Sequence, residues 1–71
     1  MINTKLFRDK MRRNGYTIAS LADHLGMSRT GLFNKIHGIR EFKISEINSI
    51  GIALRLSKAD MNRIFFAKSV E

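Results

Sequence analysis

The sequence contains no cysteine, no proline and no tryptophan, and it has only six acidic residues against thirteen lysines and arginines. Without cysteine the chain cannot form disulfides or a thiolate metal site, which favours an intracellular protein. The lack of proline, together with 44% hydrophobic residues, is typical of a compact helical unit. No apolar run approaches the ~18 residues of a membrane span, and the start, MINTKLFRDKMRR, lacks the apolar region of a signal peptide. We therefore expect a soluble, cytoplasmic protein without a membrane partner.

The length of 71 residues suits one small domain, and we expect residues 1–71 to form it. A chain of this size buries only about 60% of the surface that it exposes when unfolded. Its hydrophobic core is therefore small, and burial of further surface in a dimer would add stability.

The charge favours a polyanionic partner, because the formal net charge is +7. Residues 1–43 hold nine Lys or Arg against three Asp or Glu, a net +6, whereas residues 44–71 hold four against three, a net +1. The positive charge thus lies in the first half of the chain, and we expect the second half to contribute mainly to the packed core.

Capping residues and glycines divide the sequence into five predicted helices, so the predicted fold class is all-α. The first covers about residues 4–14 and ends at an Asn-Gly pair, which tolerates a left-handed stop. The second follows Thr17 as its N-cap, repeats apolar residues at i, i+3, i+4 and i+7, and ends at Gly26. Ser28 is the N-cap of the third helix, which ends before Gly38. Two helices joined by about three residues with glycine first form the helix-turn-helix arrangement.

The fourth helix is predicted over about residues 44–54. Four of its apolar residues are expected to face inward: Ile44, Ile47, Ile50 and Leu54. Gly51 inside this helix costs stability, and the close approach of another helix would explain it.

The fifth helix opens with Ser57 as N-cap and Asp60 at the third helical position, which is close to a capping box. It runs to about Ile64 or Phe66, although the tail IFFAKSV could also pair as a short extended strand. One phenylalanine of this tail is expected to complete the core, while the other supports a dimer contact with its apolar neighbours; the alternative is that both are buried in the monomer. The candidate dimer-contact residues are Ile64, Phe65, Phe66 and Val70.

The third helix has only two bulky aliphatic residues, Leu32 and Ile36, which lie about 40° apart on a helical wheel and define its buried direction. Its polar residues then point away from the core. Gly31 lies on one flank, where bare backbone would let the helix pass a sugar-phosphate wall or pack against the second helix.

The exposed side of this helix carries side chains that read base edges in a DNA major groove. Arginine can bond bidentately to guanine and asparagine to adenine, and threonine offers a hydroxyl or a methyl group. Phe33 could contact a thymine methyl group or lie at the rim of the core. The candidate base-reading residues are Arg29, Thr30, Phe33 and Asn34.

Phosphate contacts are expected from three kinds of residue. Two cap helix N-termini, three are cations at the far end of the third helix and in the basic loop after it, and one is a histidine that could also be simply exposed. These candidates are Thr17, Ser28, Lys35, Arg40, Lys43 and His37.

The segment TIASLADHLGMSRTGLFNKIHG resembles the helix-turn-helix of the lambda-repressor-like family, the small repressors and Cro proteins of phages. It shares an N-capping Thr, Leu-Ala in mid-helix, Leu-Gly at the turn, a Ser before the recognition helix and a closing Gly. The chain also resembles small Cro-like regulators of phages of Gram-positive bacteria through SRTGLFNKIHG, the EF of REFK, the EI of SEINSI and FFAKSV.

The resemblance covers nearly the whole chain and implies a compact five-helix domain that binds double-stranded operator DNA as a homodimer, within a bacterial host cell. Bases would be read from the third helix, by the four candidates named above. Two positions depart from the family: Ile18 stands where glutamine is frequent near the DNA, and Met11 stands where arginine is frequent. Any phosphate contact from the first helix would then come from neighbours such as Arg12 or Arg13.

No cofactor, metal or small-molecule ligand is expected. His24 and His37 are far apart and have no cysteine partners, no carboxylate is paired with a histidine at a convincing spacing, and no phosphate-cradling glycine loop is present. The chain is therefore not expected to be an enzyme. Two alternatives stay open: an architectural or excision factor that bends DNA, and a protein-interaction module, antitoxin-like or anti-repressor, whose basic face binds an acidic partner.

Overall fold

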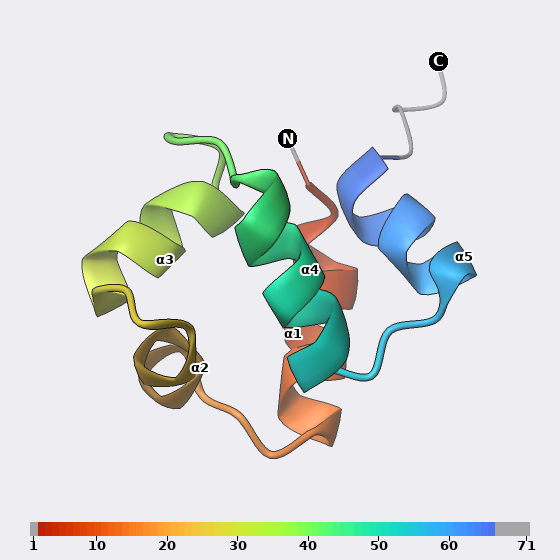
Figure 1. Ribbon diagram of the computed structural model, residues 1–71, viewed down its shortest axis with the longest axis horizontal. Helices are drawn as coiled ribbons and strands as arrows, with labels where there is room; N and C mark the ends of the chain where they lie inside the picture. The colour runs from red at the N-terminus through yellow and green to blue at the C-terminus, as the bar shows by residue number, and fades with distance from the viewer. Residues whose placement is uncertain (1, 67–71) are drawn as a thin grey trace.

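The computed structural model describes residues 2–66, which form five α-helices and one π-helical segment, with no strand among them (Figure 1). The elements are α1 (Thr4–Arg13), α2 (Ile18–Leu25), α3 (Arg29–Ile36), α4 (Ile44–Ala53), α5 (Lys58–Met61) and η1 (Asn62–Phe66), which continues directly from α5. The molecule is compact, with extents of 34 × 24 × 20 Å. The predicted all-α class is confirmed.

Reciprocal caps begin α2 and α5 where the sequence predicts helix starts. The Thr17 hydroxyl accepts a hydrogen bond from the Ser20 N–H at 3.0 Å, and the Ser20 hydroxyl accepts one from the Thr17 N–H at 2.9 Å. At α5, the Ser57 hydroxyl accepts from the Asp60 N–H at 3.0 Å, and the Asp60 carboxylate accepts from the Ser57 N–H at 3.4 Å. These bonds satisfy N–H groups that the first turn of a helix leaves unpaired, and a cap contributes about 1 kcal/mol.

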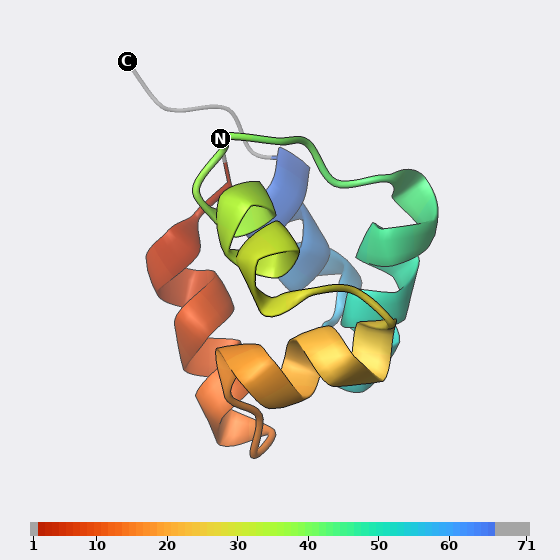
Figure 2. The same cartoon turned by 90° about the vertical axis from the view of Figure 1, so that its left-hand side faces the viewer.

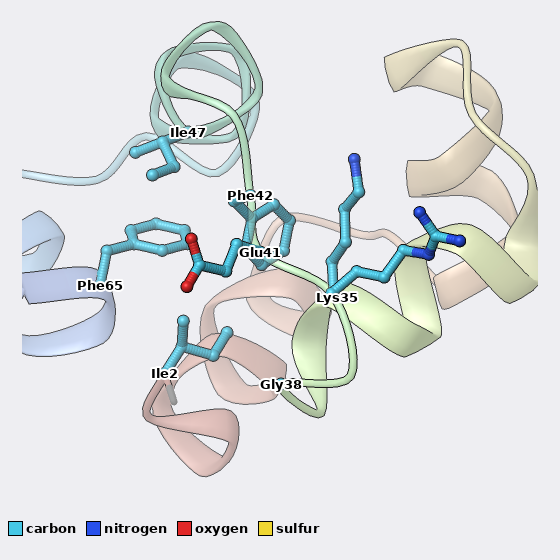
Figure 3. A pocket seen from close by; sticks show the side chains of 8 residues that line it. Ile2, Lys35, Gly38, Glu41, Phe42, Ile47 and Phe65 are labelled. Atoms are coloured by element: carbon cyan, nitrogen blue, oxygen red, sulfur yellow. The ribbon is translucent and has the colours of Figure 1, made fainter.

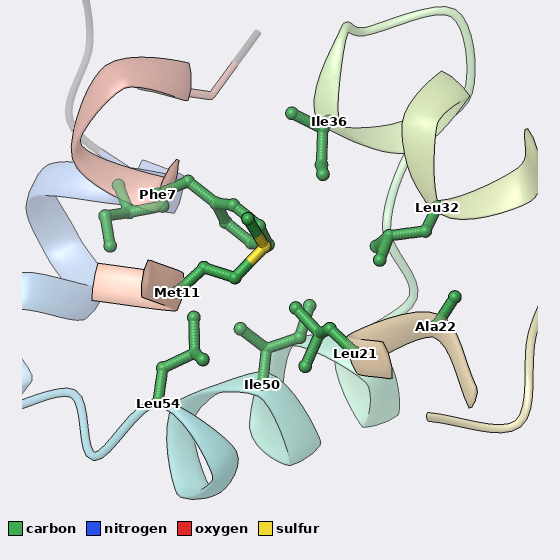
Figure 4. Packing of buried hydrophobic residues seen from close by; sticks show 9 residues of the cluster. Phe7, Met11, Leu21, Ala22, Leu32, Ile36, Ile50 and Leu54 are labelled. Atoms are coloured by element: carbon green, nitrogen blue, oxygen red, sulfur yellow. The ribbon is translucent and has the colours of Figure 1, made fainter. Parts of the chain in front are cut away.

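The hydrophobic core lies where α1, α2, α3, α4 and η1 meet (Figure 4). Its buried members are Phe7, Met11, Leu21, Ala22, Leu32, Ile36, Ile50, Leu54 and Ile64. Fully burying one large aliphatic or aromatic side chain contributes about 1.5–3 kcal/mol, so a small number of residues holds the helices together.

The predicted inward face of α4 is correct except at its first residue. Ile47, Ile50 and Leu54 are buried, but Ile44 is 68% exposed, so the prediction for Ile44 is wrong. Ile44 directly follows the loop from α3, and the core begins only at the next turn of α4. A hydrophobic period identifies one face of a helix but not how far along that face another element covers it.

Gly51 allows α5 to approach α4 closely, as predicted. A Cβ atom built at Gly51 would lie 2.9 Å from the sulfur of Met61 and 3.1 Å from its terminal methyl carbon. Met61 is the last residue of α5, so the bare backbone makes room for its side chain.

Ile64, Phe65 and Phe66 lie in the helical segment η1, so the strand alternative is wrong for these three residues. Ile64 is only 1% exposed, and its carbonyl accepts a hydrogen bond from the Asn3 N–H at 2.9 Å. Because its side chain is inside the core, the prediction that Ile64 supplies a dimer contact is also wrong.

The two adjacent phenylalanines differ, as expected. The Phe65 ring packs 5.6 Å from the ring of Phe42 and 6.3 Å from that of Phe7, whereas Phe66 is 54% exposed. Phe65 thus extends the core, and Phe66 stays exposed beside it. Val70, the remaining dimer candidate, lies outside the described residues.

No helix of residues 2–66 is long and apolar enough to cross a membrane.

Candidate nucleic-acid interface

The helices α2 and α3 lie together at one side of the molecule and are joined by a three-residue turn (Figure 2). Gly26 ends α2 with φ 72° and ψ 29°, a left-handed conformation that favours glycine. Ser28 then caps α3, because its hydroxyl accepts a hydrogen bond from the Gly31 N–H at 2.9 Å. The predicted stop and start are confirmed.

The buried face of α3 is the one that the sequence predicts. Leu32 and Ile36 are both 0% exposed and point into the core (Figure 4). Arg29 and Thr30 are exposed at the opposite side, and Phe33 is 45% exposed. Two buried anchors therefore fix which residues of α3 can meet a partner.

Gly31 has a local reason that the sequence analysis missed. A Cβ atom built there would lie 2.9 Å from the Ser28 hydroxyl oxygen, and no other atom of the described chain would contact it within 4 Å, apart from its chain neighbours and its own helix backbone. The proposed packing of Gly31 against α2 is therefore wrong. A side chain at this position would instead crowd the Ser28 hydroxyl.

His37 and Asn34 are half-buried rather than fully exposed. The His37 ring lies 4.3 Å from the Phe33 ring, centroid to centroid, and its Nε2 atom is 3.2 Å from Nη2 of Arg8. An arginine can only donate, so Nε2 of His37 is the acceptor in this bond. His37 is predicted to point away from the core and to be exposed, but it joins α3 to α1 and is half-buried.

An open hollow of about 450 Å³ lies between α1, α2 and α3. We call it the α1–α3 hollow; its lining residues are Arg8, Ile18, Arg29, Thr30 and Phe33. Three predicted base-reading residues therefore lie at one depression. Arg8 and Ile18 join them, although the sequence analysis gave neither a role there. The first helix, TKLFRDKMRR, contains five cations, and nothing in that sequence singles out Arg8.

Lys35 is held in an ion pair instead of being free for a phosphate. Its Nζ atom lies 2.7 and 2.6 Å from the two carboxylate oxygens of Glu46 in α4, and its side chain is only 15% exposed. Partial burial alone would raise the pKa of Glu46, but hydrogen bonds from Lys35 and from the Lys43 N–H outweigh it and hold the pKa below its ordinary value. The structure thus argues against Lys35 as a phosphate clamp and makes it a tie between α3 and α4.

Arg40 and Lys43 are exposed in the loop between α3 and α4, as the predicted phosphate contacts require. Arg40 also lines a second hollow, of about 270 Å³. Lys35 and Glu41 line it as well (Figure 3). The apolar side of this second hollow is formed by Ile2, Phe42, Ile47 and Phe65.

Two cations of α1 are paired with carboxylates. Lys10 lies 3.4 Å from Asp60, and Arg13 lies 3.1 Å from Asp9. A hydrogen bond from the Ser57 N–H, assisted by Lys10, holds the pKa of Asp60 below its ordinary value despite partial burial. Lys10 therefore ties α1 to α5, and Arg8 is the α1 cation that lines the hollow near α3.

Within residues 2–66, no group of three or more His, Asp or Glu side chains is placed to hold a metal ion. Comparisons of the chain with protein-family models, with curated proteins and with solved structures find no match. The geometry of α2 and α3 is therefore the basis on which a function is argued.

Proposed function

We propose that the protein is a sequence-specific DNA-binding regulator in which α2 and α3 act as a helix-turn-helix and α3 enters the major groove. The orientation of α3 carries the proposal. Leu32 and Ile36 hold one side in the core, and the side that remains accessible carries Arg29 and Thr30. Arginine and threonine are suited to base edges, where an arginine can donate two hydrogen bonds to one guanine.

The dimensions of α3 support this assignment. An α-helix with its side chains is about 10–12 Å in diameter, and a major groove is about 12 Å wide. The outward residue Thr30 is short and Gly31 has no side chain, so the helix can approach the base edges closely. The flexible Arg29 can reach past the helix end toward a base.

Charge supports a nucleic acid rather than a neutral partner. The α1–α3 hollow has an arginine from α1 and another from α3, and none of its lining residues is acidic. Exposed Arg40 and Lys43 follow in the next loop, where they would contact backbone phosphates. The N-termini of α2 and α3, capped by Thr17 and Ser28, offer N–H groups for the same purpose.

The resemblance to Cro-like regulators suggests how such a protein would act. Two copies would bind a pseudo-palindromic operator, with their α3 helices in successive major grooves about 34 Å apart, and would block polymerase. One molecule is 34 × 24 × 20 Å, so two neighbouring copies can span that separation. Phe66, exposed beside the core, is the described residue that we assign to the dimer contact.

Selection of binding sites from a pool of random duplexes, with the purified full chain, tests the proposal. We expect a symmetric consensus whose half-sites are 10–11 base pairs apart, and affinity that falls steeply with salt. A pool without enrichment, together with weak binding that does not respond to salt, would contradict it and favour a protein-interaction module. A minor-groove footprint with strong bending would favour an architectural factor.

A further inference from the structure

The α1–α3 hollow combines an apolar wall with flanking positive charge. Ile18, the first residue of α2, and Phe33, from the middle of α3, line it with the hydroxyl and methyl groups of Thr30. Arg8 and Arg29 complete the lining. An apolar surface between two cations fits a ligand that is itself partly apolar and carries negative charge.

In the major groove, thymine presents a 5-methyl group, and no other standard base does. The methyl group lies near the phosphate backbone of its own strand, so it brings an apolar surface and a negative charge to the same place. Ile18 matters here because it is the apolar residue that α2 contributes to the hollow. A polar side chain at that position would offer the methyl group no apolar wall.

The Phe33 ring packs against His37, which in turn bonds Arg8. The His37 ring lies 4.3 Å from the Phe33 ring, and the Arg8 guanidinium lies 3.2 Å from Nε2 of His37. The arrangement holds an aromatic ring that is 45% exposed, and it also directs the Arg8 charge toward the hollow. Arg8 has further N–H donors available for a phosphate oxygen.

We propose that the α1–α3 hollow receives the 5-methyl edge of a thymine, packed between Ile18 and Phe33, while Arg8 binds a neighbouring phosphate. His37 is a positioning residue, because it acts on the DNA through Phe33 and Arg8. This inference rests on the proposed function and adds the base that one part of the interface selects.

The test replaces each thymine of the selected duplex, one at a time, by deoxyuridine, which lacks only the methyl group. We expect one thymine per half-site at which the replacement weakens binding about fourfold, the worth of one buried methyl group. Bromodeoxyuridine at that position, with bromine of similar size to the methyl group, should restore affinity. Affinity is measured by fluorescence anisotropy with the wild-type chain, so this arm does not depend on any variant folding.

Variants then assign the contact to the hollow. Ile18→Ala and Phe33→Ala should reduce the deoxyuridine effect at that position to less than twofold, whereas Ile52→Ala, which changes an exposed residue of α4, should leave it at about fourfold. His37→Gln, which keeps an acceptor for Arg8, should retain more of the effect than His37→Leu. A purely structural role for His37 would change overall affinity without changing the thymine preference.

Two results would overturn the inference. If the chain binds its selected duplex and no deoxyuridine position matters, or the effect persists in both Ile18→Ala and Phe33→Ala, the hollow does not read thymine, although the proposed function stands. If no duplex is selected, the proposed function fails and this inference fails with it.

Discussion

Replacing Gly31 by alanine tests how this glycine affects the stability of α3 through the Ser28 cap. Alanine is more favourable than glycine in a helix by about 1 kcal/mol. The new Cβ atom would lie 2.9 Å from the Ser28 hydroxyl oxygen, however, so the hydroxyl must shift from the position in which it accepts a hydrogen bond from the Gly31 N–H at 2.9 Å. Thr17 and Ser57 cap the N–H groups of residues that carry a Cβ atom, so this shift strains the Ser28 cap without abolishing it. Complete loss of a serine cap costs about 1 kcal/mol, so we expect Gly31→Ala to raise the free energy of unfolding by less than the ~1 kcal/mol that helix propensity alone would give.

The matched background is Ser28→Ala, which has no hydroxyl to collide with. We expect Ser28→Ala alone to destabilise the protein by about 1 kcal/mol, and the addition of Gly31→Ala in that background to return about 1 kcal/mol. Urea denaturation followed by far-UV circular dichroism gives the free energy of unfolding of the wild type, the two single variants and the double variant. The reasoning is refuted if Gly31→Ala has the same effect whether residue 28 is serine or alanine, since the cap would then not be the neighbour that matters.

Three further outcomes test the interface and its support. Arg29→Ala should weaken binding to the selected duplex by about 1–3 kcal/mol and relax base preference at one position, whereas Arg55→Asn, a charge-matched control in the turn after α4, should not change that preference in a binding titration with base-substituted duplexes. Arg40→Ala or Lys43→Ala should weaken binding to all sequences alike and reduce the slope of log affinity against log salt by about one; a loss confined to one operator would contradict a phosphate contact. The lowered pKa of Glu46 means that its contribution to stability is present above its unfolded-state pKa and is lost as the pH falls through the folded-state value. In Glu46→Gln the free energy of unfolding, measured by urea denaturation, should therefore fall less as the pH is lowered through that range. The same pH dependence as in the wild type would count against the ion pair.

Features set by neighbouring residues could be predicted from the sequence. The caps at Thr17, Ser28 and Ser57 each depend on a side chain and an N–H three residues later, and all three are present. The buried side of α3 followed from two aliphatic residues in an otherwise polar helix, because nothing else in that segment could anchor it. How much of the opposite side is exposed depended on the other helices, since Asn34 and His37 are half-buried.

Features set by distant residues could not be predicted in this way. Lys35 and Glu46 are eleven positions apart on different helices, and Arg8 and His37 are 29 apart. Their sequence contexts, a basic helix end and a cluster of cations, are the same whether the side chains are paired or free. Only the packing of α3 against its neighbours decides which of these groups face one another.

Contacts between distant residues also decide which cations of the chain are available to a polyanion. The first half carries a net +6, but Lys10, Arg13 and Lys35 are within 3.4 Å of carboxylates, and the Lys10 and Lys35 pairs hold helices together. A bound polyanion would have to compete with those carboxylates to use them. The cations that line the hollow or follow it in the α3–α4 loop carry no such carboxylate contact within residues 2–66: Arg8, Arg29, Arg40 and Lys43. The salt dependence of binding should therefore reflect these few residues near α3 rather than the net charge of the sequence.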